Sequence, residues 1–273
     1  MIPIRLGLKA SSDPKQVESR LRYHPQVFEF HTDQEDFSTE GLKRLEEAII
    51  EVRNAGVETI ILHHPMKYKE RFCELLAHSS NNSELVNFID SSIQDLLTLA
   101  KKYDAKVLVH GSYEMREPDL LTPFDDKLQA QNYLLDRLLS LYQKYPDHLI
   151  FENGIWSLFA FGHEDFDKKL AQTKLPLAYD ISHAFIELEG DMAALLTSLD
   201  NLKDNIQHYH LVDSMGRSHD SLTLGQGKVD WAAVLPHLNP NASYIYEINL
   251  ADMTNPAEQL ASHEYLVGIN RKK

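Results

Sequence analysis

The chain alternates between short apolar runs and longer amphipathic segments along its whole length, and this alternation constrains its fold more than any other feature. The apolar runs are rich in Val, Ile, Leu and aromatic residues, as expected for strands that are buried on both faces. We count eight runs, at residues 4–8, 27–30, 59–62, 106–109, 149–151, 175–179, 206–211 and 244–248.

The segments between the runs carry apolar residues at helical spacing and have recognisable ends. The helix that begins at Thr39 is stopped by Gly56, and the one that begins at Asp125 is closed by Pro146. We expect helices at residues 14–23, 39–50, 83–103, 125–145, 165–172, 191–202, 231–238 and 256–267. A strand followed by a helix eight times over is typical of an α/β protein with a (β/α)8 TIM barrel. We predict a single such domain over residues 1–273.

An open, doubly wound sheet is the alternative for this alternation. Such a sheet normally carries a glycine-rich phosphate-binding loop after its first strand. Here the first run is followed by Lys9-Ala-Ser-Ser-Asp-Pro14, which contains no glycine. The barrel is therefore the favoured fold.

Charge and cysteine content restrict the partners and the compartment. The chain has 41 acidic against 27 basic residues and a formal net charge of −14, which argues against nucleic acid or an anionic membrane as a partner. The single cysteine, Cys73, excludes an internal disulfide and a multi-Cys zinc cluster. No apolar run is long enough to span a bilayer, and the first is too short for a signal peptide. We expect a cytoplasmic protein.

Six consecutive runs end on or near side chains that can bind a metal ion. In a barrel the active site is built at the C-terminal ends of the strands, where these side chains would meet. They are His63, His110, Glu152, Asp180 with His183, His210, and Glu247. Carboxylate oxygens and imidazole nitrogens without thiolates suit Zn²⁺, Mn²⁺, Mg²⁺ or Co²⁺ in an open, reactive site.

The motifs around these strand ends resemble, in their order, those of the xylose isomerase-like TIM barrels. They are Leu62-His63-His64-Pro65, Val109-His110-Gly111-Ser112, Phe151-Glu152-Asn153, Tyr179-Asp180-Ile-Ser-His183, His208-Tyr-His210-Leu-Val-Asp213-Ser and Leu224-Gly-Gln-Gly-Lys-Val-Asp230-Trp231. That superfamily includes sugar epimerases, sugar-phosphate isomerases and apurinic endonucleases of the endonuclease IV type. The resemblance covers nearly the whole chain.

The resemblance implies one divalent metal ion bound by Glu152, Asp180, His210 and Glu247. In the epimerases and isomerases the metal holds a carbonyl and an adjacent hydroxyl oxygen of the sugar. The carboxylates that correspond to Glu152 and Glu247 face opposite sides of the carbon that exchanges its proton. One of them removes the proton and the other returns a proton to the opposite face, while the developing enediolate charge is stabilised.

The resemblance also implies contacts to the substrate. His183 and Arg217 would hold sugar oxygens and help to stabilise the enediolate charge. His63 and His110 would hydrogen-bond the sugar. In the endonuclease IV-type enzymes, however, the histidines at these two positions bind an additional zinc ion, so a second metal ion at His63 and His110 is left open. His64 is expected to point away from the barrel, because neighbouring residues of a strand face opposite sides.

One difference separates this chain from the endonuclease IV-type branch. A third zinc ion there needs a D-x-H pair before the G-x-G segment, whereas this chain has His219-Asp220-Ser221, and Ser is a poor zinc ligand. We therefore predict a divalent-metal-dependent isomerase or epimerase of a sugar or sugar phosphate. The alternatives are an endonuclease IV-type phosphodiesterase acting at abasic DNA sites and a non-catalytic metabolite-binding barrel. A homo-oligomer is left open.

Overall fold

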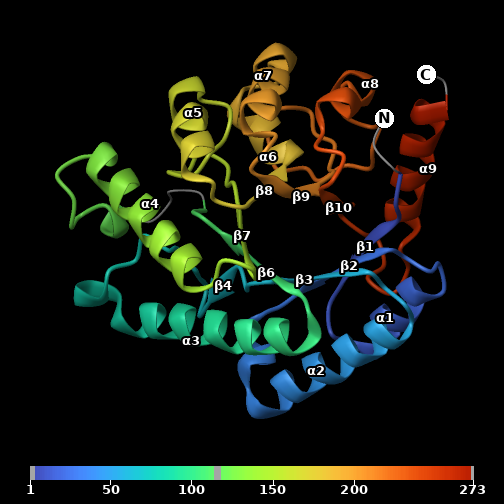
Figure 1. Ribbon diagram of the computed structural model, residues 1–273, viewed down its shortest axis with the longest axis horizontal. Coiled ribbons are helices and arrows are strands. Elements are labelled where there is room, and N and C mark those ends of the chain that lie inside the picture. Colours follow the sequence, from blue (N-terminus) through green and yellow to red (C-terminus); the bar gives the residue numbers. More distant parts are fainter. Residues whose placement is uncertain (1–3, 114–117, 272–273) are drawn as a thin grey trace.

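Eight parallel strands follow one another around a barrel in the computed structural model, which describes residues 4–113 and 118–271 (Figure 1). Each strand is hydrogen-bonded to its neighbours in the order β1 (Gly7–Ala10), β2 (Val27–His31), β3 (Thr59–His63), β6 (Lys106–His110), β7 (Leu149–Glu152), β8 (Leu177–Asp180), β9 (Ile206–His210) and β10 (Ser243–Ile245). The predicted TIM barrel is confirmed.

The last strand, β10, approaches the first strand, β1, at Gly7. A Cβ atom on Gly7 would lie 1.8 Å from the carbonyl oxygen of Tyr244 and 3.0 Å from the Cα atom of Ile245. Beside this contact, the backbone N–H of Arg5 donates a hydrogen bond to the Tyr244 hydroxyl over 2.6 Å. Because any Cβ atom would overlap the backbone of β10, only glycine fits at the position where β1 and β10 meet.

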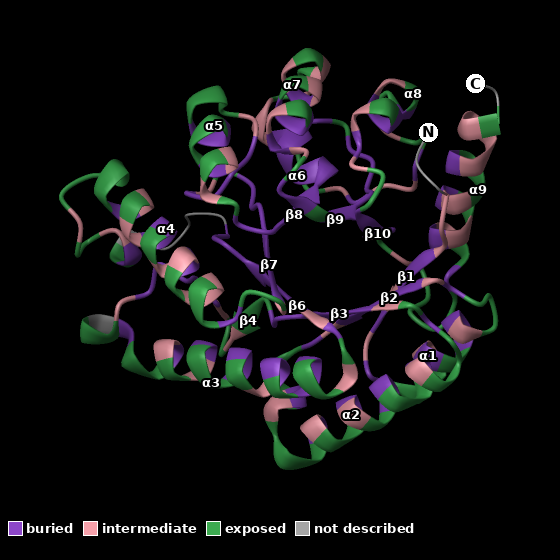
Figure 2. Cartoon of the chain, in the orientation of Figure 1, coloured by how far each residue is buried: buried purple, intermediate pink, exposed green. Residues whose placement is uncertain are grey.

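Helices surround the barrel, and most of them expose their outer faces to solvent, whereas the helix Ile181–Glu187 is almost entirely buried (Figure 2). They are α1 (Pro14–Leu21), α2 (Thr39–Asn54), α3 (Ser79–Tyr103), α4 (Lys127–Lys144), α5 (Glu164–Thr173), α6 (Ile181–Glu187), α7 (Met192–Leu202), α8 (Trp231–Val234) and α9 (Ala257–Arg271). Several begin at a side chain that caps the first turn: Asp13 accepts from the backbone N–H of Lys15, and Ser38 from that of Gly41.

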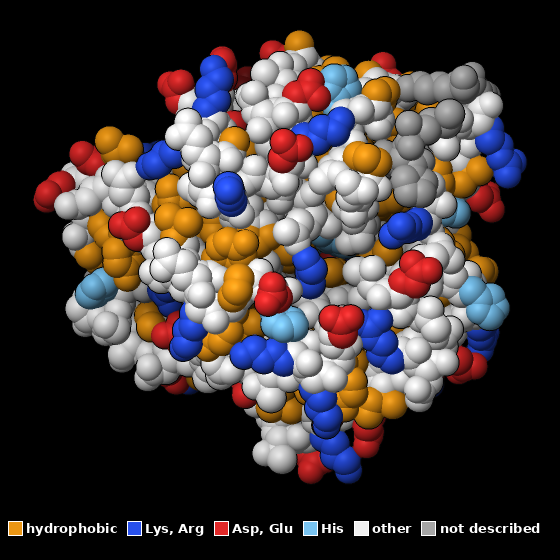
Figure 3. All heavy atoms as spheres, in the orientation of Figure 1, with side chains coloured by type: hydrophobic (Ala, Val, Ile, Leu, Met, Phe, Trp, Pro, Cys, Tyr) orange, Lys and Arg blue, Asp and Glu red, His pale blue; other side chains and the backbone are white. Residues whose placement is uncertain are grey.

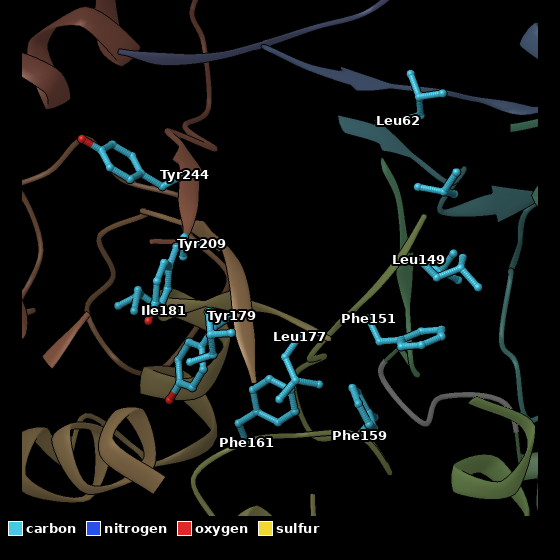
Figure 4. Close-up of a cluster of buried hydrophobic side chains, with 14 of the residues drawn as sticks. Leu62, Leu149, Phe151, Phe159, Phe161, Leu177, Tyr179, Ile181, Tyr209 and Tyr244 are labelled. Carbon is cyan, nitrogen blue, oxygen red and sulfur yellow. The ribbon is translucent and has the colours of Figure 1, made fainter. Parts of the chain in front are cut away.

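Alternation along the strands divides the core into two layers. Outward-facing side chains pack beneath the helices, and Figure 4 shows Phe151, Tyr179 and Tyr209 in this outer layer. A second, smaller apolar cluster has one residue from each of four neighbouring strands: Ile61, Leu108, Ile150 and Ala178. Two positions further along the same four strands lie His63, His110, Glu152 and Asp180. The strand period of two therefore turns these candidate ligands toward the barrel interior.

Some elements differ from the sequence-based expectation. Strand β1 covers Gly7–Ala10 rather than residues 4–8, because Gly7 through Ala10 pair in register with β2. Helix α3 begins at Ser79, and a kink at Asn82 joins its first turn to the expected helix. Additional elements include helix α6, which starts directly after β8, and an antiparallel hairpin of β4 (Lys67–Tyr68) and β5 (Arg71–Phe72).

The charges on the visible face (Figure 3) and the character of the helices bear on whether a membrane or nucleic acid is a partner. On the face drawn in Figure 3, basic and acidic side chains are interspersed. In the described segments, no helix combines the length and the apolar character needed to cross a membrane.

Candidate metal and substrate site

Glu152, at the end of β7, is the centre of the candidate site. The Nε2 atoms of His63 and His110 lie 3.2 Å and 3.0 Å from its Oε2. Its other oxygen, Oε1, lies 3.0 Å from Nδ1 of His210 on β9. Glu152 is fully buried. The barrel thus brings together side chains from β3, β6, β7 and β9 that are far apart in sequence.

The four residues implied as metal ligands also converge. One ligand atom from each of Glu152, Asp180, His210 and Glu247 lies within 4.8 Å of the others. Nδ1 of His210 is 2.5 Å from Oε2 of Glu247 and 3.7 Å from Oδ2 of Asp180. Within the described part of the chain, both Glu152 oxygens and His210 Nδ1 are buried without a well-aligned hydrogen bond. Unsatisfied buried acceptors of this kind, in an oxygen and nitrogen donor set, fit a divalent metal ion.

Asp180 is held so that one oxygen remains for this cluster. Its Oδ1 atom caps helix α6, accepting from the His183 backbone N–H over 2.7 Å and from the Ser182 hydroxyl over 2.8 Å. The Asp180 backbone N–H in turn donates to Oδ1 of Asn153 over 2.8 Å. Asp180 is therefore both the last residue of β8 and the cap of α6. Because the cap uses Oδ1, Oδ2 remains directed toward His210.

Two residues next to the cluster were missed by the sequence analysis: Glu29, which is buried, and Lys9, which is partly exposed. Oε2 of Glu29 on β2 lies 3.0 Å from Nε2 of His210 and 3.2 Å from Nε2 of His208. Its Oε1 lies 3.1 Å from Nζ of Lys9 on β1, which also contacts Glu247. A signal was present, because Glu29 is a carboxylate inside the apolar run 27–30, and a charge buried in a strand needs partners.

The carboxylates of the cluster raise the pKa values of His210 and His183. Burial opposes protonation of His210, but Glu152, Glu29 and Glu247 outweigh burial and raise its pKa well above the ordinary value. Burial also opposes protonation of His183, whose pKa is nevertheless raised by Asp180 and Glu152. The position between these carboxylates therefore favours positive charge, as a cation site should.

Burial alone dominates at His110. It lowers the pKa of this histidine to about 3, although the neighbouring Glu152 acts in the opposite direction. His110 is thus a neutral imidazole at physiological pH. A neutral ring nitrogen is the form that binds a metal ion or accepts a hydrogen bond from a hydroxyl group.

A cavity of about 670 Å³ opens over the cluster. It is lined by Lys9, His31, Thr32, His63, Met66, Phe72, His110, Tyr113, Gly154, Ile155, His183, His219, Ser221, Glu247, Ile248, Asn249, Leu250, Met253 and Gln259. The predicted substrate contacts His63, His110 and His183 are thus on its wall. Of the four implied ligands, Glu247 reaches the cavity, with 30% of its side chain exposed.

Other residues singled out in the sequence lie at the rim or outside the site. Arg217 is exposed and does not belong to the described cavity lining, so the structure does not bring it to the cluster. His64 turns its Nε2 toward the Ser92 hydroxyl of α3, 2.8 Å away, as strand alternation predicts. His219 is exposed, with its Nε2 atom 3.3 Å from Nε2 of His183.

The fold and the clustered side chains define a TIM barrel with a candidate metal site at the C-terminal ends of its strands. The chain belongs to the xylose isomerase-like TIM barrel family, whose sequence profile matches residues 26–265. The family resemblance drawn from the strand-end motifs is thereby confirmed.

Proteins of similar sequence and structure come from several sources. The uncharacterized protein MJ1311 of Methanocaldococcus jannaschii is 23% identical over 235 residues, which cover 82% of this chain and 75% of that protein. A D-tagatose 3-epimerase-like protein is 18% identical, with a TM-score of 0.70 over 98% of this chain and 97% of that one. D-psicose 3-epimerase of Clostridium cellulolyticum H10, solved with D-tagatose, is 13% identical, with a TM-score of 0.66 and coverages of 98% and 97%. At these identities the solved structures share the fold.

Proposed function

We propose that this protein is a divalent-metal-dependent isomerase or epimerase of a sugar or sugar phosphate. The observation that carries the proposal is the convergence of three carboxylates and His210 Nδ1 beside a cavity walled by further histidines. The likeness to solved sugar epimerases supports it. The substrate is expected to carry a carbonyl group next to a carbon that bears both a hydrogen and a hydroxyl group.

Glu152, Asp180, His210 and Glu247 would hold the metal ion. When bound, a divalent ion polarises a carbonyl oxygen and stabilises the negative charge that develops on it. We assign proton abstraction to Glu247, because among the four it is the side chain that lines the cavity. Glu152 would be the second carboxylate, which holds or returns a proton on the other side of the reacting carbon.

The histidines on the wall would bind the substrate oxygens. His183 donates through Nδ1 to the carbonyl oxygen of Asn153, 2.8 Å away, which leaves Nε2 on the cavity side. His63 donates through Nδ1 to the carbonyl oxygen of His64 over 2.8 Å, so its neutral form presents an Nε2 lone pair to the interior. Each ring is thereby fixed in one orientation, which positions a substrate for reaction.

A second metal ion at His63 and His110 belongs to the same proposal. Their Nε2 atoms and Oε2 of Glu152 form a second cluster with the spacing of a metal site. Nε2 of His63 lies 3.2 Å from Oε2 of Glu152, so the two atoms could be ligands of one cation. Whether one or two ions bind is decided by elemental analysis of protein purified without chelator.

Solvent exchange tests the proposal most directly. Protein loaded with Mn²⁺ or Zn²⁺ is incubated in D2O with a panel of free and phosphorylated ketoses, and deuterium incorporation is followed by NMR. We expect incorporation at the carbon next to the carbonyl group, and a loss of about 10²–10⁴-fold for Glu247→Gln. Glu47→Gln, on an exposed face of α2, is the matched control. The proposal is contradicted if the loaded wild-type protein exchanges no ketose or if Glu247→Gln retains full activity.

A further inference from the structure

Lys9 and Glu29 face each other inside the barrel, on the side opposite the apolar cluster of β3, β6, β7 and β8. They are direct partners in the register between β1 and β2. Lys9 Nζ lies 3.1 Å from Oε1 of Glu29 and contacts Oε1 of Glu247. Its side chain is 12% exposed, and that exposed part belongs to the cavity wall.

The ammonium group of Lys9 has a donor left for a ligand. An ammonium group carries three N–H donors. Within the described segments, Nζ contacts two acceptor groups, the carboxylates of Glu29 and Glu247. The third N–H is therefore available on the cavity side, next to the carboxylate to which we assign proton abstraction.

Glu29 keeps Lys9 in this position. Besides Lys9, Glu29 is anchored through its Oε2 by His208 and His210, and His208 Nδ1 lies 2.7 Å from the Ser243 hydroxyl. All of these groups are on strands of the barrel, so the ammonium group is held by rigid elements. A donor preorganised in this way is most effective where negative charge develops during a reaction.

We propose that Lys9 is a further catalytic residue, whose ammonium group donates a hydrogen bond to the substrate oxygen that becomes negative when Glu247 removes the neighbouring proton. The inference rests on the proposed function. The C–H bond breaks, its proton moves to Glu247, and its electron pair forms a C=C bond while the carbonyl oxygen takes the negative charge. Lys9 keeps its proton throughout, and reprotonation of carbon reverses the electron flow. The expected substrates are therefore α-hydroxy ketones and aldehydes.

Glycolohydroxamate is a suitable probe, because it is an anionic mimic of an enediolate that does not react. Its binding to the Mn²⁺-loaded protein is measured by calorimetry for the wild type, Lys9→Met and Lys9→Arg. We expect Lys9→Met to bind it 10–100-fold more weakly and Lys9→Arg to recover part of the loss. Lys106→Met is the matched control, because Lys106 is at the opposite end of the barrel, where it contacts Gln207.

Ketose exchange gives a second, kinetic readout. Lys9→Met should lower kcat for exchange by about 10²–10³-fold and leave KM nearly unchanged, as is typical for loss of one preorganised donor. A purely structural role would instead lower the melting temperature and the Mn²⁺ content. If Lys9→Met does not fold, Lys9→Gln, which keeps a polar head against Glu29, takes its place.

The outcomes separate this inference from the proposed function. Equal binding of glycolohydroxamate by the folded wild type and Lys9→Met overturns the role of Lys9, as does a wild type that does not bind the probe. Tighter binding by the wild type, without exchange of any ketose, supports Lys9 as a donor to an anionic oxygen and contradicts the isomerase or epimerase activity. Weaker binding together with a lower kcat supports both.

Discussion

Nε2 of His210 lies 3.0 Å from Oε2 of Glu29, deep in the barrel and on the far side of the ring from the carboxylate cluster. A hydrogen bond to a carboxylate fixes the proton of a histidine on the bonded nitrogen. In the neutral ring, Nδ1 of His210 then carries the lone pair and points toward Glu152 and Glu247. Glu29 would therefore orient His210 as a ligand of the proposed metal ion.

The first prediction concerns this orienting contact. Glu29→Gln removes the charge that holds the His210 proton on Nε2, and we expect Mn²⁺ affinity measured by calorimetry to fall about tenfold or more. Asp36→Asn is the control, since Asp36 is also a buried carboxylate but is bound by Arg44 and Ser12 outside the cavity lining. Unchanged affinity in Glu29→Gln would show that packing alone orients His210.

Metal binding should stabilise the protein, because an ion that binds the folded cluster and not the unfolded chain shifts the equilibrium toward the folded state. Addition of Mn²⁺ at about 100 times its dissociation constant contributes about 2.7 kcal/mol, which for a chain of this length raises the melting temperature by roughly 5–10 °C. Calorimetry after EDTA treatment and after readdition of Mn²⁺ measures the effect. Glu247→Gln should show a smaller rise. If neither EDTA nor Mn²⁺ changes the melting temperature, the cluster is not a metal site.

The candidate ligands at the strand ends were predictable from the sequence, whereas the ion pairs behind them were not. Period-two alternation and the common edge of parallel strands place His63, Glu152 and Asp180 together without any knowledge of distances. The sequence analysis did not predict helix α6, because no loop separates it from β8: Asp180 is both the last residue of the strand and the cap of the helix. The ion pair of Lys9 and Glu29 depends on the register of β1 against β2, which an apolar pattern does not specify.

Substitution at the rim should change the number of metal ions bound. The double variant His219→Asp with Ser221→His introduces a carboxylate and an imidazole beside His183, whose Nε2 now lies 3.3 Å from Nε2 of His219. We expect elemental analysis to find one additional equivalent of zinc per chain. Ser221 has a positive φ of 44°, so a histidine there inherits a left-handed backbone. An unchanged zinc content would mean that this backbone directs the new side chains away from His183.

Because Asp167 on α5 is buried, we expect the folded protein to become less stable as the pH rises from about 4 to about 6. Burial raises its pKa from 3.8 to about 6, although the Gly162 N–H, 3.2 Å away, favours the charged form. The folded protein therefore binds a proton that the unfolded chain releases, and stability falls as pH rises from about 4 to about 6. The difference amounts to about 3 kcal/mol at most. Thermal melts of Asp167→Asn across this range should show a smaller fall than the wild type. Parallel curves would contradict the assignment to Asp167.

Barrel closure depends on the missing side chain at Gly7. In Gly7→Ala the new Cβ atom would lie 1.8 Å from the carbonyl oxygen of Tyr244, a backbone atom that moves only if β10 moves. We expect a loss of at least about 1–3 kcal/mol in the free energy of unfolding by urea. Gly268→Ala in α9 is the control: nothing lies within 4 Å of its Cβ position, and alanine favours a helix by about 0.5–1 kcal/mol.

Because β10 leads directly to Glu247, Gly7→Ala should also weaken Mn²⁺ binding, whereas Gly268→Ala should not. Equal stability of the two variants would mean that β1 and β10 separate without cost.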